Sequence, residues 1–300
     1  MNEDTALIMD IDHFAVHDGP GIRTCIYFKG CPLSCTWCHS PESQSAFPQL
    51  LYAMSKCTRC GMCVKACPKG LHRLDNSLHI FTQDECGGCG FCVHKCNGGA
   101  LTISGKMMVL DAVLEEACAD EVFYRNSGGG VTVTGGEVLM QGAFVDRLLF
   151  ELRKKDIHSI VETSGYGDTE YLLSFADSAS LFYYDFKIAD PEQFNVHIGN
   201  NPSLIWDNLE KLRKKTASII LRAPLIPAIT DTEENIMALY NLARDLRLST
   251  IHLLPYNNSA GAKYTWLGKP YPLDYPDMNA KSPEDILALD HTGLNVRIIK

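Results

Sequence analysis

Apolar positions beyond about residue 105 follow two alternating spacings along the chain. Short apolar or β-branched runs predict strands at 131–134, 159–163, 181–188, 218–225 and 250–254. Between the runs, apolar residues recur every three or four positions, which predicts amphipathic helices over 109–125, 141–155 and 231–246. Strands that alternate with helices over short loops predict an α/β fold with a parallel sheet.

The N-terminal part of the chain adds two more strands to this pattern. Residues 6–29 are expected to form a strand, a turn at Asp18-Gly19-Pro20-Gly21, and a second strand that ends just before Cys31. The second strand brings the count to about six strands. We therefore expect an open or partial barrel instead of a closed barrel of eight strands.

Residues 50–105 differ in composition from the rest of the chain. This segment is rich in Cys and Gly and is short of long periodic apolar runs. Segments 1–49 and 106–300 are therefore assigned to the barrel, and segment 50–105 to an inserted module that is held together by metals instead of a hydrophobic core.

Composition and charge narrow the class of protein. The chain has 300 residues, of which 46% are hydrophobic, enough for one large core and a small module. The net charge of −9 and the lack of basic runs do not suggest nucleic-acid binding. The N-terminal stretch carries Glu3, Asp4, Asp10 and Asp12, unlike a signal peptide, and no apolar run approaches the roughly 18 residues of a membrane span.

The cysteines indicate the compartment and the chemistry. Eleven of the thirteen cysteines lie between Cys31 and Cys96, spaced too closely to pair easily with one another. Metal or cluster ligation in a reducing compartment, the cytoplasm, is the better interpretation. Cys25 and Cys118 lie outside every group and are expected to be small buried hydrophobic residues.

The first cysteine group is Cys31-x3-Cys35-x2-Cys38, at the end of the first barrel strand. Three thiolates on one short loop can bind three irons of a [4Fe–4S] cluster, which leaves the fourth iron open to a small chelating molecule. The alternative is a structural zinc ion with His39 as its fourth ligand. Zinc sites usually come as two separated pairs of ligands, which argues against it.

The inserted module contains a repeated cysteine motif. Cys57-x2-Cys60-x2-Cys63-x3-Cys67 is followed by Pro68, and the same spacing recurs at 86–96 without the proline. This is the run of bacterial ferredoxins, in which the fourth cysteine of each run ligates the other cluster. The expected ligand sets are therefore Cys57, Cys60, Cys63 and Cys96 for one cluster, and Cys86, Cys89, Cys92 and Cys67 for the other. Two zinc sites of four thiolates each are the alternative.

These motifs resemble those of the radical SAM superfamily. The first cysteine loop, with Trp37 before its third cysteine, is similar to the superfamily signature. Asp18-Gly19-Pro20-Gly21-Ile22-Arg23 and Cys38-His39-Ser40-Pro41-Glu42-Ser43 resemble the glycyl-radical-enzyme activating enzymes. The resemblance implies a partial (β/α)6 barrel in which S-adenosylmethionine chelates the open iron. It also implies that reductive cleavage yields a 5′-deoxyadenosyl radical, which takes a hydrogen atom from a glycine of the partner enzyme.

The resemblance extends to residues that would bind S-adenosylmethionine. Thr134-Gly135-Gly136-Glu137 is similar to the family element whose backbone and carboxylate hold the methionine ammonium. Glu162-Thr163-Ser164-Gly165 resembles a segment that helps to place the methionine carboxylate and a monovalent cation. The place of Trp37 inside the cysteine loop implies that its backbone lies beside the adenine.

Three later motifs complete the resemblance. Asp185-Phe186-Lys187 is similar to the family's Asp-x-Lys element, whose charged side chains share one face of a strand, although a solvated ion pair is the alternative. Arg222 resembles a family arginine near the substrate. Leu253-Leu254-Pro255-Tyr256-Asn257 matches the last element, except that several relatives carry histidine where this chain has Asn257. Tyr183, Tyr184 and Trp206 are assigned to packing.

The resulting hypothesis is an oxidoreductase of anaerobic metabolism that activates a glycyl radical enzyme. It implies three [4Fe–4S] clusters, S-adenosylmethionine, a monovalent cation, and an electron donor such as flavodoxin or ferredoxin. The stretch 127–141 resembles activating enzymes for dehydratases such as the 4-hydroxyproline enzyme, while decarboxylase and lyase partners stay open. The alternatives are a radical SAM enzyme that acts on a small molecule or another residue type, and an electron-transfer iron–sulfur protein.

Overall fold

A computed structural model describes residues 3–76, 78–216, 218–273 and 281–299. Its largest element is a sheet of nine strands in the order β13-β12-β11-β10-β9-β8-β2-β1-β7. Neighbouring strands from β2 to β13 are parallel, whereas β1 pairs antiparallel with both β2 and β7. The strands are β1 (Thr5–Ala15), β2 (Arg23–Phe28), β7 (Lys106–Val109), β8 (Gly130–Gly135), β9 (Ser159–Thr163), β10 (Leu181–Asp185), β11 (Ile219–Leu225), β12 (Thr250–Pro255) and β13 (Asn295–Ile298).

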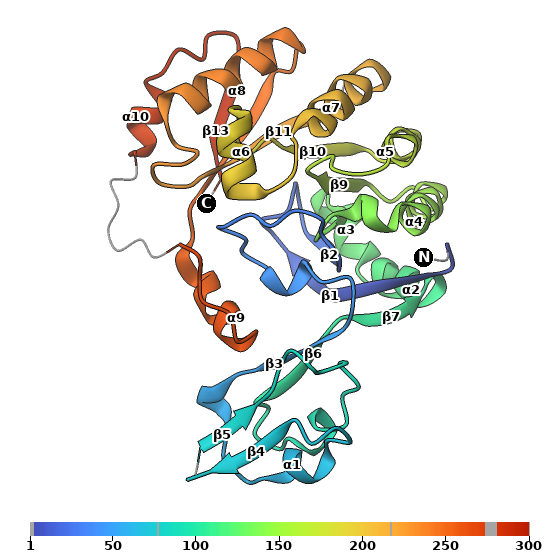
Figure 1. The fold of residues 1–300 in the computed structure, drawn as a ribbon. Helices are drawn as coiled ribbons and strands as arrows, with labels where there is room; N and C mark the ends of the chain where they lie inside the picture. Colours follow the sequence, from blue (N-terminus) through green and yellow to red (C-terminus); the bar gives the residue numbers. More distant parts are fainter. Residues whose placement is uncertain (1–2, 77, 217, 274–280, 300) are drawn as a thin grey trace.

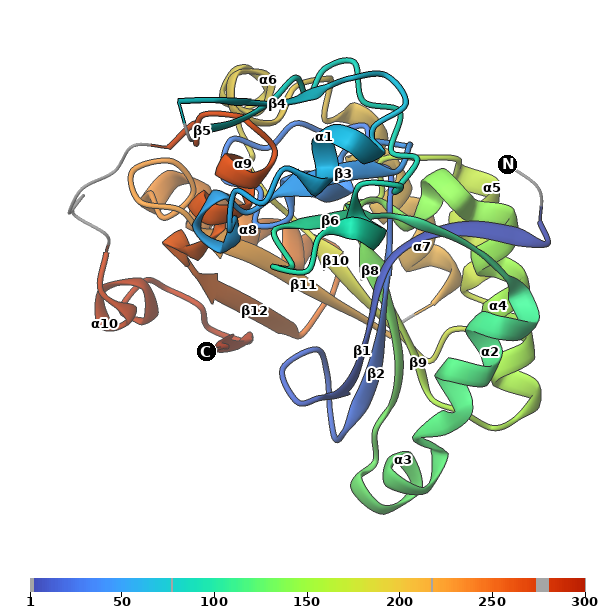
Figure 2. The ribbon, with the colours of Figure 1, turned by 90° about the horizontal axis from the view of Figure 1, so that it is seen from below.

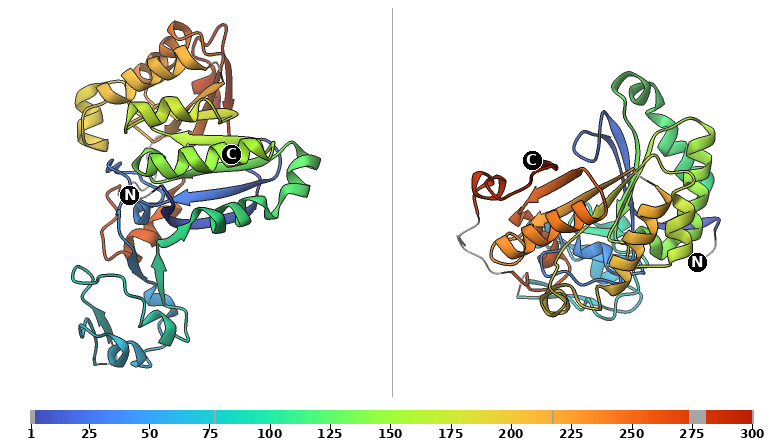
Figure 3. Two further views of the ribbon diagram at one scale, coloured as in Figure 1. Left: turned by 90° about the vertical axis from the view of Figure 1, so that its right-hand side faces the viewer. Right: turned by 90° about the horizontal axis from the view of Figure 1, so that it is seen from above.

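Helices cover the outer side of this curved sheet (Figures 1 and 3). The described helices of this part of the chain are α2 (Leu110–Ala119), α3 (Glu121–Ser127), α4 (Gly142–Lys154), α5 (Thr169–Phe175), α6 (Pro191–Ile198), α7 (Ser203–Lys215), α8 (Glu233–Asp245), α9 (Gly261–Trp266) and α10 (Pro283–Leu287). Of these, α9 is not a covering helix and lies at the lower edge of the barrel in Figure 1. On α4, apolar side chains four residues apart, such as Phe144 and Leu148, are buried against the sheet. The α/β prediction is therefore confirmed, and one large core lies between the sheet and its helices.

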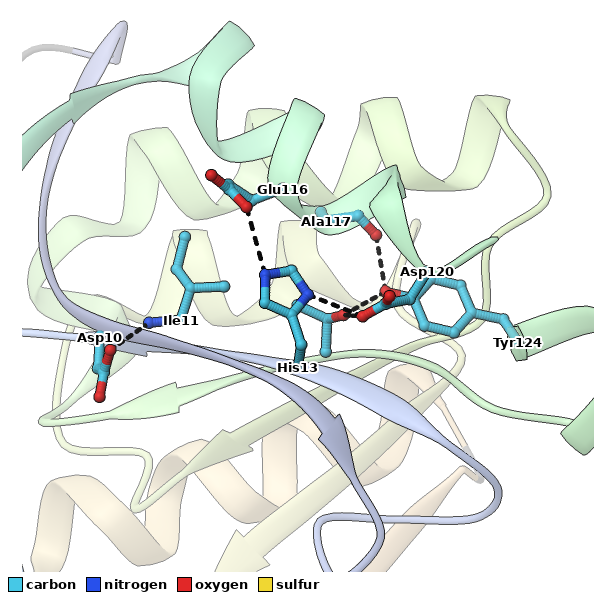
Figure 4. A network of polar contacts seen from close by, with 8 residues as sticks. Asp10, Ile11, His13, Glu116, Ala117, Asp120 and Tyr124 are labelled. Atoms are coloured by element: carbon cyan, nitrogen blue, oxygen red, sulfur yellow. Dashed lines mark hydrogen bonds and ion pairs between the residues drawn. The ribbon is translucent and has the colours of Figure 1, made fainter. Parts of the chain in front are cut away.

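The structure corrects two details of the predicted barrel. The predicted helix over 109–125 is wrong as one element, because Asp120 has non-helical angles (φ −100°, ψ 16°) and separates α2 from α3. The Asp120 carboxylate turns inward, where His13 and Thr24 contact the same oxygen at 2.7 and 2.9 Å (Figure 4). The count of about six strands missed two edge strands, β7 and β13, which are short.

Residues 49–104, from β3 to β6, form a separate lobe below the barrel (Figures 1 and 2). Its regular elements are β3 (Gln49–Tyr52), α1 (Met62–Ala66), β4 (His72–Asp75), β5 (Leu78–Phe81) and β6 (Leu101–Ser104). Strand β3 pairs with β6, and β4 pairs with β5, both antiparallel. Its apolar core has only Leu50, Cys92 and Leu101 as buried members among the described residues. We call this lobe the insert.

Short 3-10 helices complete the architecture: η1 (Pro41–Ser43), η2 (Met54–Lys56), η3 (Val93–Lys95), η4 (Val138–Gln141) and η5 (Asn258–Ala260). Among the described helices, none is both long and apolar enough to cross a membrane.

Candidate active site

The first cysteine loop leaves the carboxyl end of β2 and is anchored on two sides. On one side, Gly30 N–H donates to the Ser43 carbonyl at 2.7 Å, which ties the start of the loop to η1. On the other side, Ser34 N–H donates to the Ile198 carbonyl and Thr36 N–H to the His197 carbonyl, both at 2.8 Å. The loop is thus held at the carboxyl edge of the sheet by backbone contacts that do not depend on its thiols.

A buried lysine precedes the loop and went unrecognised in the sequence. Lys29 is fully buried, and its Nζ donates to the Glu42 carbonyl and, at 3.0 Å, to Gln49 Oε1. Burial lowers the pKa of Lys29 to about 8, while the nearby Glu42 carboxylate acts in the opposite direction. The carboxylate of Glu42 forms an ion pair with Lys263 of α9 at 2.8 Å. These contacts join the cysteine loop, the insert and α9.

The three thiols of the loop line a cavity of about 160 Å³, which we call the cluster cavity. Its other walls come from the carboxyl ends of β8, β9 and β10. Predicted site residues among its lining are Cys31, Cys35, Trp37, Cys38, His39, Gly135, Gly136, Glu137, Glu162, Asp185 and Lys187. Residues from four segments that are distant in sequence therefore meet at one place, as expected for the carboxyl edge of a parallel sheet.

Gly135 and Gly136 are required by the close approach of β8 to the cysteine loop. Gly135 has φ +113°, and a Cβ there would lie 2.4 Å from the Phe28 carbonyl oxygen. A Cβ on Gly136 would lie 2.3 Å from the Gly30 carbonyl oxygen. Because both clashes are with backbone atoms, a side chain at either position would displace the strand that presents the cysteines.

Glu137 lies at the wall of the cluster cavity and is 1% exposed. Oε1 accepts from Thr163 Oγ1 at 2.6 Å, and Oε2 accepts from Ser164 N–H at 2.9 Å and from Ser164 Oγ at 2.5 Å. Burial raises the pKa of Glu137, although the hydrogen bonds from Ser164 and Thr163 oppose this shift. The carboxylate is therefore fixed in orientation by the segment after β9.

Lys187 and Asp185 form an ion pair inside the same cavity, with Nζ 3.0 Å from Oδ2. The two side chains are only 14% and 20% exposed, so this is not the solvated pair considered as an alternative. Burial alone would lower the pKa of Lys187, but the charges of Asp185 and of the Cys35 thiol outweigh burial and raise it. A permanent cation thus lies close to Cys35.

Glu162 and Arg222 separate the cluster cavity from a larger one. Arg222 Nη1 lies 2.7 Å from Glu162 Oε2, and its guanidinium is 4.9 Å from the centre of the Tyr183 ring. The Glu162 carboxylate keeps the pKa of Arg222 raised although burial opposes it. Glu162 lines the cluster cavity, whereas Arg222 and Tyr183 line the second cavity of about 480 Å³. We call this second space the barrel cavity.

The barrel cavity lies between the β1–β2 turn and the inner faces of β10 to β13. Gly19 and Pro20 of the Asp18–Arg23 motif line it, while Arg23 is fully buried and donates from Nε to Thr132 Oγ1 at 2.7 Å. His252 also lines the cavity. Tyr183, assigned to packing from the sequence, instead presents its ring to the cavity beneath Arg222, a role that alternation along β10 could have indicated.

Three predicted cofactor-binding residues do not line the cluster cavity: Arg222, which lines the barrel cavity, and Phe186 and Asn257. Phe186 is 5% exposed and belongs to the core, so only its backbone faces the site edge. Asn257 is exposed, and its side chain accepts from Ser259 N–H at 2.9 Å at the start of η5. Asn257 also hydrogen-bonds to His39, whose pKa is lowered mainly by burial, and so lies just behind a residue of the cavity wall.

The insert gathers its eight cysteines around two cavities. Cys57, Cys60, Cys63 and Cys96 line one, which we call cavity A. Cys67, Cys86, Cys89 and Cys92 line the other, cavity B. Each group combines three cysteines of one run with the fourth of the other run, as the ferredoxin spacing predicts. All thirteen cysteines are free thiols, and Cys25 is fully buried while Cys118 packs against the core.

Comparisons with known proteins agree with this arrangement. The family model described as the radical SAM superfamily matches residues 81–240, and the 4Fe-4S dicluster domain matches residues 56–101. The chain is 38% identical over 281 residues to the choline trimethylamine-lyase activating enzyme of Oleidesulfovibrio alaskensis, covering 91% of each chain. It is 37% identical to the trans-4-hydroxy-L-proline dehydratase activating enzyme of Clostridioides difficile, covering 88% of this chain and 89% of the relative.

A third relative extends the match over nearly the whole chain. The pyruvate formate-lyase 2-activating enzyme of Escherichia coli strain K12 is 33% identical over 303 residues, with 99% of this chain and 93% of the relative covered. The chain belongs to the glycyl-radical-enzyme activating enzymes of the radical SAM superfamily. Activating enzymes of this kind carry iron–sulfur clusters and use S-adenosylmethionine, and the thiol groups fit that requirement. Three thiols face the cluster cavity and four face each insert cavity.

Proposed function

We propose that this protein activates a partner glycyl radical enzyme by reductive cleavage of S-adenosylmethionine and abstraction of a hydrogen atom from one glycine. The observation that carries the proposal is the cluster cavity, where three thiols on one loop face a fixed carboxylate and a buried cation. A [4Fe–4S] cluster held by three protein thiolates supplies the electron and an open iron for chelation. No side chain is needed as a general base.

The proposed roles of the cavity residues follow from their charge and position. The carbonyl groups of the Gly135-Gly136 turn and the Glu137 carboxylate would bind the methionine ammonium, since oxygen acceptors stabilise a cation. Lys187 would bind the methionine carboxylate, and Asp185 would accept from a ribose hydroxyl. The side chain of Glu162, near the Thr163-Ser164 segment, would complete the pocket and is the proposed place of a monovalent cation.

The barrel cavity would receive the glycine loop of the partner. At about 480 Å³ it is large enough for a few small residues in an extended segment, and residues of the β1–β2 turn and of β12 line it. Arg222, Tyr183 and His252 offer it a cation, a ring and a hydrogen-bonding imidazole. Because the Glu162–Arg222 pair lies between both cavities, a glycine held there would be close to the adenosyl group.

The identity of the partner is a proposal at the level of class. The relatives at 33–38% identity serve a lyase, a dehydratase and a formate-lyase by their names, so overall similarity does not select one. We propose a dehydratase, decarboxylase or lyase of the glycyl radical class, and consider first a dehydratase of the 4-hydroxyproline type. Thirteen free thiols and oxygen-sensitive clusters require a reducing compartment, which we propose to be the cytoplasm.

We further propose three [4Fe–4S] clusters and an acidic electron carrier such as flavodoxin or ferredoxin. Segment 50–105 has six Lys and Arg against three Asp and Glu, a balance of +3, so the rest of the chain carries −12. Exposed Arg59, Leu74 and Lys95 surround cavity A, where Cys60 is itself exposed. A positive, partly apolar rim around an exposed ligand favours an acidic one-electron carrier.

Anaerobic turnover tests the proposal directly. The reconstituted protein, reduced with dithionite, should convert S-adenosylmethionine to 5′-deoxyadenosine and methionine. Incubation with candidate glycyl radical enzymes should then produce a glycyl doublet in the EPR spectrum of the true partner. Deoxyadenosine without a doublet for any candidate partner would contradict the activating function, and the absence of deoxyadenosine would contradict the proposal altogether.

Charge-reversal substitutions test the docking of the electron carrier separately from the cleavage of S-adenosylmethionine. Arg59→Glu with Lys95→Glu should slow reduction by flavodoxin or ferredoxin at low salt while leaving dithionite-driven cleavage unchanged. Lys154→Glu on the barrel is the matched control. Equal effects of the two charge reversals on reduction would rule out carrier docking at cavity A.

A further inference from the structure

Two buried histidines of the insert lie between its two cysteine-lined cavities. His79 on β5 lines cavity A, and His72 on β4 lines cavity B. The two side chains are only 5% and 2% exposed. His72 Nδ1 lies 3.0 Å from His79 Nε2, so the rings are hydrogen-bonded directly across the wall that the cavities share.

The contacts of this pair with the cavities are unequal. His79 Nε2 lies 3.4 Å from Cys63 Sγ, and its Nδ1 lies 3.8 Å from Cys57 Sγ. His79 Nε2 contacts both His72 Nδ1 and Cys63 Sγ. When His72 donates to Nε2, the proton of His79 is on Nδ1 and is directed at Cys57 Sγ. Among the described residues, no histidine nitrogen hydrogen-bonds to a thiol of cavity B, although Leu71 N–H donates to Cys67 Sγ at 3.4 Å.

Packing fixes both rings in this arrangement. His72 stacks on Phe81 with centroids 4.5 Å apart and planes 16° apart. The His79 ring meets Tyr52 in an edge contact with centroids 4.6 Å apart. Since β4 and β5 pair in register, with His72 opposite Phe81 and Leu74 opposite His79, the hairpin sets the positions of both histidines. Rings held this way keep their hydrogen-bond geometry when the charge of a neighbouring group changes.

A hydrogen bond to a ligand sulfur changes the reduction potential of an iron–sulfur cluster. The positive end of the N–H dipole stabilises the additional negative charge of the reduced form, and a partner on the other ring nitrogen fixes the donor. We propose that His79, oriented by His72, is a positioning device that raises the reduction potential of the cavity A cluster above that of the cavity B cluster. In the step concerned, a reduced flavodoxin or ferredoxin loses one electron and the cavity A cluster gains it.

This inference rests on the proposed iron–sulfur loading of the insert but not on which glycyl radical enzyme is the partner. The test is an anaerobic redox titration of the full reconstituted protein, followed by EPR. His79→Phe should lower the potential of one insert cluster and leave the other unchanged. His72→Phe should give a smaller shift of the same cluster, and the double variant should shift it no further than His79→Phe. Iron content and EPR spin count, measured first, distinguish failed loading from a failed inference.

Three further variants make the result specific. His79→Gln retains an amide donor and should give an intermediate potential, which also covers the case that His79→Phe does not fold. His94→Phe, an exposed histidine two residues from Cys96, is the matched control and should leave both potentials unchanged. In a Cys60→Ala background, His79→Phe should no longer shift the remaining insert cluster.

Several outcomes would overturn the inference. An unchanged potential in His79→Phe, or an equal shift of both insert clusters, excludes selective tuning of cavity A. Cys63, His72 and His79 place ligand atoms within 4.8 Å of one another, so one zinc ion per chain that is lost in His72→Phe would instead assign the pair to a mononuclear metal site.

Discussion

The barrel and the insert are stabilised by different means. The barrel has a continuous core that includes fully buried residues of most of its strands and helices, among them Ile26, Leu148 and Leu221. Among its described residues, the insert has three buried members of an apolar cluster, and thiols are part of the lining of cavities A and B. A segment of this size buries too little apolar surface to order its loops, and we propose that metal ligation by these thiols supplies the remaining stabilisation.

The two kinds of cysteine site also differ in how their cysteines are held in place. The first cysteine loop is held by backbone hydrogen bonds to η1 and to the end of α6, so its shape is set by the barrel. In the insert, Cys63 lies in α1, and Cys57 and Cys96 end the 3-10 helices η2 and η3, all elements of three to five residues. The barrel therefore preorganises its cysteine loop, whereas we propose that cluster binding would organise the insert.

The largest expected effect is that of removing iron. Chelation under reducing anaerobic conditions should unfold residues 56–101 and leave the barrel folded, because ligation contributes on the order of 10 kcal/mol to small metal-bound domains. Hydrogen exchange followed by mass spectrometry would show rapid exchange in the insert and continued protection of β8 to β10. Protection of the insert amides after iron is lost would contradict this view.

Removal of one thiol from the barrel and removal of one from the insert should have different effects on the cleavage of S-adenosylmethionine and on the EPR signals of the insert. Cys35→Ala should reduce dithionite-driven cleavage of S-adenosylmethionine by at least about 10³-fold, since the site loses a ligand of the reacting cluster. The EPR signals of the insert should persist. Cys89→Ala should remove one insert signal and leave dithionite-driven cleavage within about tenfold of the unmodified protein. Equal losses of cleavage in both variants would contradict a separate role of the insert.

How far the sequence predicts the molecule also differs between the two regions. The spacing of apolar residues and the order of the motifs along the chain predicted the strands that carry the site. This was possible because each of these strands ends in a short, recognisable sequence motif. Cysteine spacing predicted which thiols share each insert cavity. These features are local in sequence, and their consequences follow from general rules of strands and clusters.

The features that the sequence did not predict depend on tertiary contacts. Lys29 looks like a surface residue at a strand end, yet Glu42 and Gln49 bury it. Asp120 continues a helical pattern and nevertheless breaks the helix, because Thr24 and His13 lie opposite it. The His72–His79 pair similarly depends on the register of a hairpin in a segment of low regularity.

Leucine-to-alanine substitutions in the two regions should change the free energy of unfolding by different amounts, and these changes are smaller than the effect of iron removal. Leu148 on α4 is fully buried, and Leu148→Ala should lower the free energy of unfolding of the barrel by about 3 kcal/mol. Leu74 in the insert is 43% exposed, and Leu74→Ala should change stability by less than about 0.5 kcal/mol. Guanidinium unfolding of the iron-loaded protein, with fluorescence and iron absorbance as separate probes, measures both. A large effect at Leu74 would indicate a hydrophobic core in the insert.

The smallest expected effect concerns the polar network on the outer face of the barrel (Figure 4). His13 Nδ1 lies 2.7 Å from Asp120 Oδ2, and its Nε2 lies 3.2 Å from Glu116 Oε2. The hydrogen bond with Asp120 raises the pKa of His13, although burial opposes the shift. The folded state therefore binds the proton more tightly than the unfolded state. The resulting stability is fully present below the ordinary pKa of about 6.5 and is lost as the pH rises through the raised pKa.

The comparison of His13→Gln with the unmodified protein at pH 6 and pH 9 measures this contribution. The difference in unfolding free energy should be no more than about 1 kcal/mol at pH 6, because His13 is partly exposed, and should shrink at pH 9. Glu116→Gln, which leaves the shorter contact with Asp120 intact, should give a smaller pH-dependent difference. A difference that grows with pH would show that His13 is neutral in the folded state. If the difference is as small as expected, this network adds little to a barrel that is stabilised by its core. Iron removal should have a much larger effect on the insert.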